Sequence, residues 1–213
     1  MKTIPSIAWA VAATLLCGAT AQAQDNTVKL SVSVYQPHPK NDGINGIGIP
    51  PGAGVNLSSA TTAIFTYERM VTPNVGIELV VGVPPTIKAN ASGSLAFLGD
   101  DVFSAKIVAP TVLVNYHFFE PGSTWRPYVG AGLNYTRFTD IKSRISSDVK
   151  MGDSFGLALH AGIAYALTKE FGLYANIAGA KVKSNVVSSG STVLTTTIDF
   201  RPIVYSLGVS YAF

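Results

Sequence analysis

Residues 154–167 read SFGLALHAGIAYAL, and their alternation decides the fold. Every second position, from Phe155 to Leu167, carries an apolar or aromatic side chain. The positions between them carry serine, glycine, alanine or histidine. A period of two residues is typical of a β-strand, in which successive side chains point to opposite faces. The stretch therefore predicts a strand with one large apolar face and one face of small residues.

The same alternation recurs along the chain and predicts seven further strands. They cover residues 28–35, 60–70, 75–83, 106–119, 127–138, 171–183 and 203–213. The pattern is clean in the first, third and last of these segments and weakest in 171–183. No apolar run of 18 residues follows residue 23, so the sequence predicts no membrane-spanning helix.

The composition indicates that these strands lie in lipid. Hydrophobic residues make up 47% of the 213 residues and charged residues only 13%, whereas a soluble domain usually has about 25% charged residues. Small residues on one strand face suit a narrow lumen, and large aliphatic faces flanked by Tyr and Phe suit lipid. A sheet in lipid has to close on itself, because open edges would leave unpaired backbone groups. We therefore predict an all-β fold, an eight-stranded antiparallel transmembrane β-barrel; the alternative is a soluble sandwich or calycin barrel.

The first residues have the features of an export signal. Lys2 precedes an apolar stretch at 7–17, and Ala21-Gln22-Ala23 supplies a small-x-small cleavage pattern. We expect residues 1–23 to be a cleaved signal peptide and 24–213 to be the outer-membrane barrel domain. A permanent N-terminal anchor is the alternative, but the apolar stretch is too short to cross a bilayer core of about 30 Å as a helix.

The connections between the predicted strands alternate in length. Short ones cover 71–74, 120–124 and 168–170, and long ones cover 37–59, 84–105, 139–153 and 184–195. Outer-membrane barrels have short periplasmic turns and longer extracellular loops. We therefore expect both chain ends in the periplasm and the long connections, including the Gly/Pro-rich stretch 43–54, to be extracellular loops.

The sequence gives no evidence for a cofactor or for nucleic-acid binding. Cys17 is the single cysteine, and His38, His117 and His160 are far apart, so we expect no disulfide, metal site or cofactor. The net charge of +3 includes no basic block, which argues against nucleic acid. No nucleophile constellation is visible, and we interpret His160 as a hydrogen-bonded lumen residue of a non-enzymatic protein.

Three stretches of the chain resemble the OmpW family of small outer-membrane barrels. They are residues 72–79 (TPNVGIEL), 125–138 (WRPYVGAGLNYTRF) and the terminal Tyr211-Ala212-Phe213, and Pro110-Thr111 also fits. The resemblance implies an eight-stranded barrel with a narrow, partly hydrophobic lumen in the outer membrane of a Gram-negative bacterium. It also implies passage of small hydrophobic molecules, and some members serve as receptors for phage or bacteriocins. Loops 37–59 and 184–195 do not contribute to it.

Four ionisable residues in the lumen phase lie near periplasmic strand ends. They are Lys29, Glu68, Glu78 and His117. Buried charges persist only when they are paired, and here one lysine serves two carboxylates. We expect a charged layer at the bottom of the lumen, either as a salt-bridge network that closes the barrel or as a gate.

Apolar lumen residues favour a channel. Ile64, Val80 and Leu113 fall in the lumen phase at mid-height and above. An eight-stranded interior holds only its own side chains or one small ligand, which argues against a wide aqueous porin. The leading hypothesis is passive uptake of small hydrophobic solutes. The alternative is a structural or receptor barrel whose loops bind phage, bacteriocin or a host surface.

Prolines predict a weak seam in the wall. Pro110 falls in the lipid-facing phase of the strand 106–119, and Pro84-Pro85 end the strand 75–83. Proline gives no ladder donor and normally occurs at edges or bulges. We hypothesise a lateral opening between these two strands; the alternative is that the prolines merely end the sheet where the loops begin.

The C-terminal segment is expected to have two roles. The alternation that ends in Tyr211 and Phe213 predicts a lipid-facing strand that also acts as an assembly signal. The expected partners are outer-membrane lipid and lipopolysaccharide, the outer-membrane assembly machinery and small hydrophobic solutes, with the barrel itself a monomer.

Overall fold

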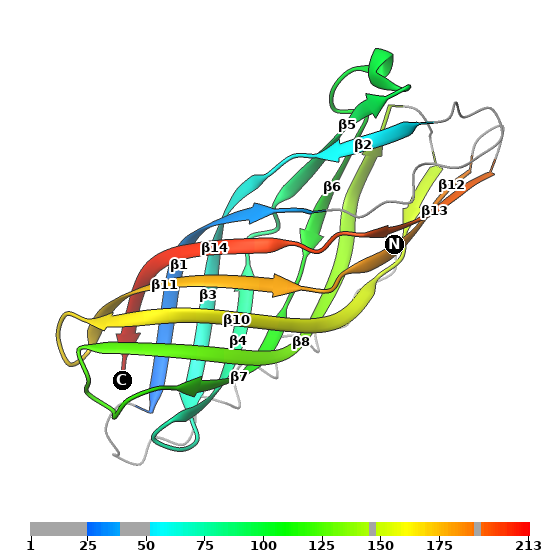
Figure 1. The fold of residues 1–213 in the computed structure, drawn as a ribbon. Coiled ribbons are helices and arrows are strands. Elements are labelled where there is room, and N and C mark those ends of the chain that lie inside the picture. The colour runs from blue at the N-terminus through cyan, green and yellow to red at the C-terminus, as the bar shows by residue number, and fades with distance from the viewer. Residues whose placement is uncertain (1–24, 39–51, 145–147, 190–192) are drawn as a thin grey trace, which may run out of the picture.

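The computed structural model describes residues 25–38, 52–144, 148–189 and 193–213, and the predicted signal peptide lies outside them. Eight antiparallel strands form the barrel wall (Figure 1): β1 (Asn26–Gln36), β3 (Ala60–Met70), β4 (Val75–Gly82), β7 (Thr111–His117), β8 (Trp125–Ser143), β10 (Ser154–Ala166), β11 (Phe171–Ala180) and β14 (Ile203–Ala212). Each strand pairs with the next in the order β10-β11-β14-β1-β3-β4-β7-β8, and β8 pairs back with β10. The predicted eight-stranded antiparallel barrel is confirmed.

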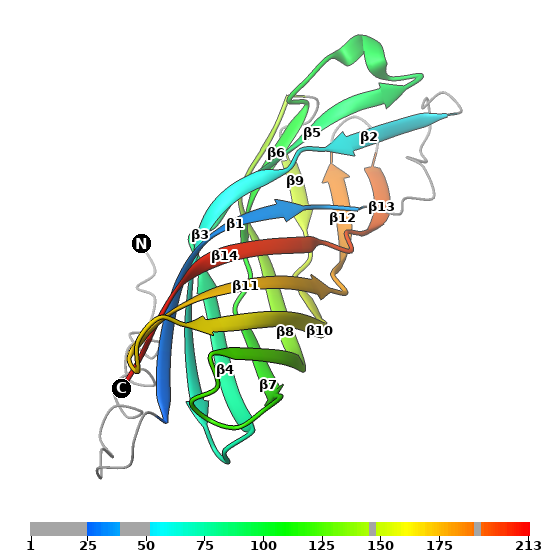
Figure 2. The same cartoon turned by 60° about the vertical axis from the view of Figure 1, so that its left-hand side comes forward.

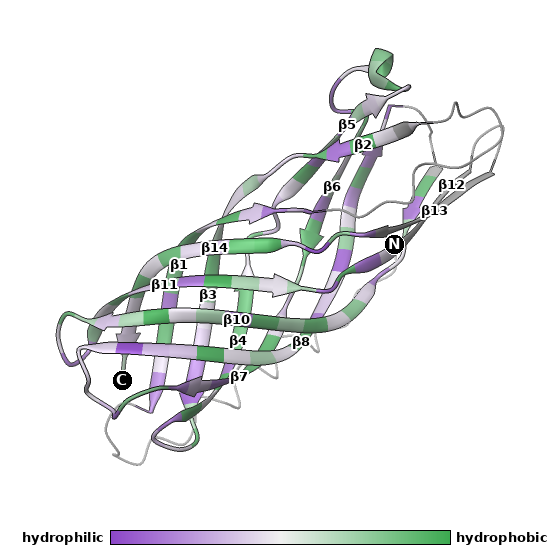
Figure 3. Ribbon diagram, viewed as in Figure 1, coloured by the Kyte–Doolittle hydropathy of each residue, from purple (hydrophilic) through white to green (hydrophobic). Residues whose placement is uncertain are grey.

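The wall separates a lipid-facing surface from a small-residue interior. Leu207, Phe155 and Leu159 are 68%, 69% and 64% exposed, whereas Ser33 and Asn115 are fully buried. The alternating hydropathy of the strands is visible in Figure 3. A water-soluble sandwich would bury its large apolar faces, so this distribution excludes the soluble alternative. Within the described residues, no helix is long and apolar enough to cross a membrane.

The connections at the two ends of the barrel differ in length. The short turns and the C-terminus lie at one end (Figure 1), where Asn26 and Phe213 exchange backbone hydrogen bonds of 3.2 and 2.8 Å. At the other end, three strands continue the wall from β8 in the order β6 (Phe103–Val108), β5 (Thr86–Gly93) and β2 (Ala53–Leu57). A second sheet there contains β9 (Asp148–Met151), β12 (Lys183–Ser189) and β13 (Val193–Asp199). Figure 2 shows both extensions beyond the barrel.

Parts of the long connections 84–105, 139–153 and 184–195 are therefore paired strands. Beyond the barrel, β5 and β6 remain paired because buried and exposed side chains still alternate along them. Ile87 and Ala105 are buried, whereas Thr86 and Lys106 are exposed. The buried side chains form one group, which we call the outer apolar cluster: Tyr35, Ile87, Ala105, Ile107, Phe138, Val182 and Phe200. A 3-10 helix, η2 (Ala96–Leu98), joins β5 to β6. Residues 43–51 of the Gly/Pro-rich stretch 43–54 lie outside the described residues.

Two predicted strands are also divided. The segment 106–119 is interrupted at Ala109-Pro110, where β6 ends and β7 begins, and 171–183 is interrupted between Ala180 and Lys183. At the first interruption proline cannot donate a ladder hydrogen bond. The barrel strands thus end at the level where the extracellular extensions begin.

Candidate functional site

One lysine joins two carboxylates at the periplasmic end of the lumen. Lys29 Nζ on β1 donates to Glu68 Oε2 on β3 and to Glu78 Oε2 on β4, at 2.8 Å each. The three side chains are 5% exposed or less. Such a buried lysine is held by paired acceptors, because an unpaired buried charge would be strongly destabilising.

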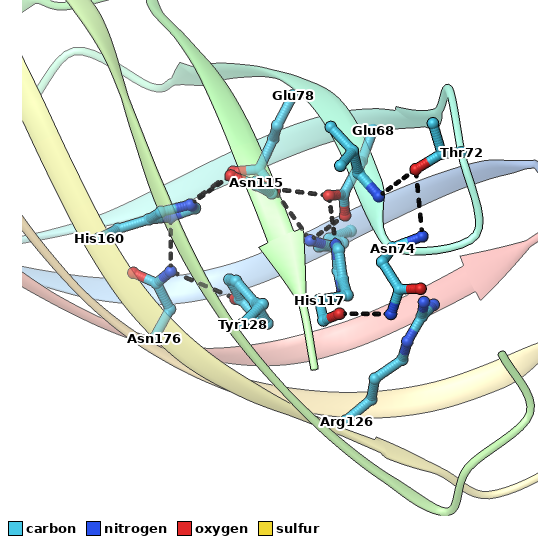
Figure 4. Close-up of polar contacts among 12 residues, drawn as sticks. Glu68, Thr72, Asn74, Glu78, Asn115, His117, Arg126, Tyr128, His160 and Asn176 are labelled. Carbon is cyan, nitrogen blue, oxygen red and sulfur yellow. Dashed lines mark hydrogen bonds and ion pairs between the residues drawn. The ribbon is translucent and has the colours of Figure 1, made fainter. Parts of the chain in front are cut away.

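Amide and imidazole groups extend this pair across the lumen. Asn115 Nδ2 on β7 donates to Glu68 Oε1 (2.7 Å) and Glu78 Oε2 (3.0 Å), and His117 Nε2 donates to Glu68 Oε1 at 2.6 Å. Asn115 Oδ1 is therefore free to accept from His160 Nε2 on β10, at 2.7 Å. Figure 4 shows these side chains converging from separate strands.

The network reaches the far wall through two more residues. Asn176 Nδ2 on β11 lies 2.9 Å from His160 Nδ1 and 3.2 Å from the Tyr128 hydroxyl of β8. We call the connected group the lumen floor: Lys29, Glu68, Glu78, Asn115, His117, Tyr128, His160 and Asn176. Because its members come from seven strands of the wall, the floor spans the lumen from side to side.

Glycines in the lumen phase make room for the floor. A Cβ atom at Gly130 would lie 2.1 Å from Asn115 Oδ1 and 2.4 Å from His160 Nε2. A Cβ atom at Gly162 would lie 2.5 Å from the Tyr128 hydroxyl. The small residues that alternate along β8 and β10 therefore allow the polar side chains to meet at the centre of a narrow barrel.

The turns below the floor are tied together by two of the segments that carry the family resemblance. Arg126 of β8 donates to the carbonyl of Pro73 in the β3–β4 turn. In the same turn, Asn74 Nδ2 donates to the carbonyls of His117 and Phe119, at 2.7 and 2.8 Å. These contacts hold the β3–β4 turn against β7 and β8 beneath the lumen (Figure 4).

A cavity of about 150 Å³ lies above the floor. Lys29, Glu78, Tyr128, His160 and Asn176 contribute to its lining, which also includes all three apolar residues expected in the lumen, Ile64, Val80 and Leu113. Tyr35, Ile107 and Val182 of the outer apolar cluster line it as well. The cavity therefore lies between the charged lumen floor and the outer apolar cluster.

The wall beside this cavity has an interruption in its hydrogen-bond ladder. Pairing of β4 with β7 ends at Val80↔Thr111, and the next backbone bond between the two chain segments runs from Ile107 N to Pro85 O at 3.0 Å. Residues 81–84 and 108–110, all described, are not paired with each other. We call this interval the seam gap. Gly82, Val83, Pro85, Ala109 and Thr111 line the cavity, so the cavity extends to the gap.

Pro110 acts on a different ladder from the one we expected. Its carbonyl accepts from Tyr135 N of β8 at 3.1 Å. The N–H and C=O of a strand residue point to the same side, so the donor that proline lacks belongs to the β7–β8 ladder. The seam gap therefore arises from the change of register between Val80↔Thr111 and Thr86↔Lys106, not from Pro110.

The structure brings together the four ionisable residues expected at the bottom of the lumen and places Tyr211 and Phe213 on the outer surface, with their rings 6.0 Å apart. Sequence reasoning missed Asn115, Tyr128 and Asn176 as members of the floor and missed the role of Arg126. The first three could have been predicted, because each has a lumen-facing position near the periplasmic end of its strand. Within the described residues, no group of three His, Cys, Asp or Glu side chains could hold a metal ion.

Comparison with known proteins fits this architecture. The model of the OmpW family matches residues 22–213. The chain belongs to the OmpW family. Outer membrane protein W of Vibrio cholerae is 31% identical over 200 residues, which cover 90% of each protein. The crystal structure of OprG from Pseudomonas aeruginosa has a TM-score of 0.81 at 25% identity and covers 90% of this chain and 96% of OprG. The P. aeruginosa dibenzothiophene metabolism operon protein PahQ is 31% identical over 121 residues, 56% of this chain and 54% of PahQ.

Family membership and the barrel architecture together place this OmpW-family protein in the outer membrane of a Gram-negative bacterium, as the sequence predicted.

Proposed function

We propose that the barrel is a passive channel for small hydrophobic molecules, with an exit through the side wall at the seam gap. The observation that carries the proposal is the cavity, which has the lumen floor beneath it and extends to residues on both sides of the gap. A solute in this cavity is separated from the periplasm by the floor. The seam gap gives it a path into the membrane that does not cross the floor.

The properties of the cavity favour an apolar solute. An apolar cavity of about this volume can hold a molecule of the size of benzene. Passage through the floor would require breaking buried charge-assisted hydrogen bonds, which are worth about 1.5–3 kcal/mol each. The relative PahQ takes its name from an operon for dibenzothiophene metabolism. A small aromatic, water-insoluble compound of about the size of benzene suits the cavity.

Uptake of a hydrophobic fluorescent probe by cells with and without the protein tests the channel. Ala109→Trp places a large side chain in the seam gap and is expected to slow uptake strongly. Ala131→Trp is the matched control, because Ala131 lies on the exposed face of β8 away from the gap. Both variants are checked for folding by their migration on gels before and after boiling.

Each outcome decides one part of the proposal. Equal uptake by cells with and without the protein would rule out the channel. Uptake that depends on the protein but is unchanged in folded Ala109→Trp would rule out the lateral exit while leaving the channel in place.

A receptor role is the second candidate. The extracellular end carries paired strands, β2-β5-β6 and β9-β12-β13, which present an ordered surface beyond the membrane. Such a surface suits the binding of phage, bacteriocin or a host surface. Loss of binding on shortening the β5–β6 hairpin, with probe uptake absent from the outset, would favour this role over the channel.

A further inference from the structure

Two cations lie on the outer surface just beyond the extracellular ends of β11 and β14. Gly179 is paired with Ile203, Phe200 N donates to Val182 O at 2.8 Å, and Lys183 is paired with Asp199. The register is the same on both sides, so Lys181 lies near the level of Arg201, although the two are not a ladder pair and Arg201 has a positive φ of 36°.

All of these charged side chains point away from the barrel interior. Val182 and Phe200 are 2% and 4% exposed and pack in the outer apolar cluster. Lys181 and Lys183 flank the buried Val182 and Arg201 follows the buried Phe200; all three are exposed, so they face outward. We call these three residues the outer cationic group.

Carboxylates balance the outer cationic group only in part, and its one nearby carboxylate, Asp199, lies directly opposite Lys183 on the β12–β13 ladder. Asp199 Oδ2 accepts from Arg201 Nε at 2.9 Å and neutralises one charge. Another acid on the wall, Asp153, accepts a hydrogen bond from the Tyr135 hydroxyl at 2.5 Å. Asp153 also lies at the level of another cation, Arg137, rather than at that of Lys181 and Lys183. Lys181 and Lys183 have no ion-pair partner among the residues that the structure describes. Two exposed lysines elsewhere do have partners: Lys88 and Lys106 are paired with Asp101 and Asp140 at 2.7 Å.

The height of the group corresponds to the outer edge of the apolar band. Phe171 and Tyr211, with ring centroids 5.0 Å apart, mark the periplasmic interface. Lys181 follows Phe171 by ten residues, and Arg201 precedes Phe213 by twelve. With a rise of about 3.3 Å per residue and a strand tilt near 40°, both cations stand roughly 25–30 Å above the periplasmic interface, and the apolar band of such barrels is about 25 Å tall.

We propose that the outer cationic group binds the phosphates of a phosphorylated lipid in the outer leaflet, that is, the lipid A part of lipopolysaccharide. Lysine and arginine form strong charge-assisted hydrogen bonds with phosphate oxygens. The apolar side chains directly below, such as Ile177 and Tyr205, are 45% exposed each and lie where the acyl chains of the same lipid would pack. The phosphates would neutralise the positive charge of Lys181 and Lys183.

Thermal unfolding of the purified barrel in a neutral detergent with EDTA tests this site. Lipid A with two phosphates is expected to raise the unfolding temperature of the natural protein. Dephosphorylated lipid A and inorganic phosphate are expected to leave it unchanged, which identifies the phosphorylated headgroup on a lipid as the ligand. An equal rise with dephosphorylated lipid would mean that acyl chains alone bind, and a rise with inorganic phosphate would mean a free-anion site; either would overturn the proposal.

Variants locate the site. Lys181→Gln with Lys183→Gln keeps the Arg201–Asp199 pair and is expected to weaken lipid A binding about tenfold or more. Lys88→Gln with Lys106→Gln removes the same number of charges elsewhere and is expected to bind like the natural protein. Lys181→Arg with Lys183→Arg should keep binding. Undiminished binding by the first variant, or equal losses in the first two, would refute the assignment.

Discussion

Glu68 and Glu78 occupy directly opposite positions on β3 and β4, and a single ammonium group, Lys29 Nζ, lies 2.8 Å from both carboxylates. Two carboxylates at opposite positions repel each other, so the lysine is what allows them to coexist. Glu68 has the larger set of partners, because His117 and Asn115 also donate to it. Glu78 shares Lys29 and Asn115 and lies 3.8 Å from His160 Nδ1.

The two carboxylates are therefore expected to differ in their contribution to stability. Glu78→Gln removes the repulsion and leaves the Lys29–Glu68 pair in place. Glu68→Gln weakens the charge-assisted bonds from both Lys29 and His117, and its loss in stability is expected to exceed that of Glu78→Gln by about 1–3 kcal/mol. Urea unfolding in lipid vesicles measures both, with the turn variant Glu170→Gln as an exposed control. A larger loss for Glu78→Gln would contradict this account of the floor.

A methyl group at Gly130 is expected to disrupt the floor. Gly130→Ala places a Cβ atom within 2.4 Å of both partners of the Asn115–His160 hydrogen bond, and overpacking of this kind costs about 1–3 kcal/mol. Gly179→Ala is the matched control, because the nearest atom to its added Cβ, Pro202 O, lies at 3.8 Å. Equal stability of the two variants would show that the floor rearranges freely.

Pro110→Val is expected to strengthen the wall without closing the seam gap. Valine would supply an N–H on the side of Tyr135, so the β7–β8 ladder gains a hydrogen bond. Unfolding should require slightly more urea, and uptake of a hydrophobic probe should stay at the level of the natural protein. Slower uptake in this variant would mean that the opening lies between β7 and β8.

The folded barrel is expected to migrate differently on a gel before and after boiling. Its backbone hydrogen bonds are satisfied around the closed ring of eight strands, so detergent alone should not unfold it. Circular dichroism should show β-structure in the unboiled sample. Identical migration together with a helical spectrum would be incompatible with the fold.

Deletion of Phe213 tests the predicted assembly signal. Phe213 is 46% exposed and stacks on Tyr211 at the periplasmic interface. We expect its loss to lower the amount of barrel in the outer membrane more than it lowers stability in detergent, as measured by cell fractionation and by urea unfolding. Normal outer-membrane levels of the truncated chain would argue against a role in recognition by the assembly machinery.

Strand alternation predicted the wall well because each strand has one lipid face and one lumen face, as Leu207 and Ser206 illustrate. It failed where a segment has no lipid to face: β5 and β6 are held by the outer apolar cluster, and residues such as Ile87 and Ala105 become informative only once they are paired. The charged members of the floor were visible from phase and position. Their hydrogen-bond partners depend on which strands meet across the lumen, and Asn115 and Asn176 come together only through His160.

The lumen floor has a consequence for the cell as well as for the protein. If the lumen floor stays closed during transport, as the proposed side exit requires, hydrated ions and sugars would have no continuous aqueous path through the barrel. An organism could therefore display many copies of this barrel and still keep out water-soluble antibiotics. Selectivity for hydrophobic solutes would then follow from the closed lumen floor rather than from specific recognition of the solute.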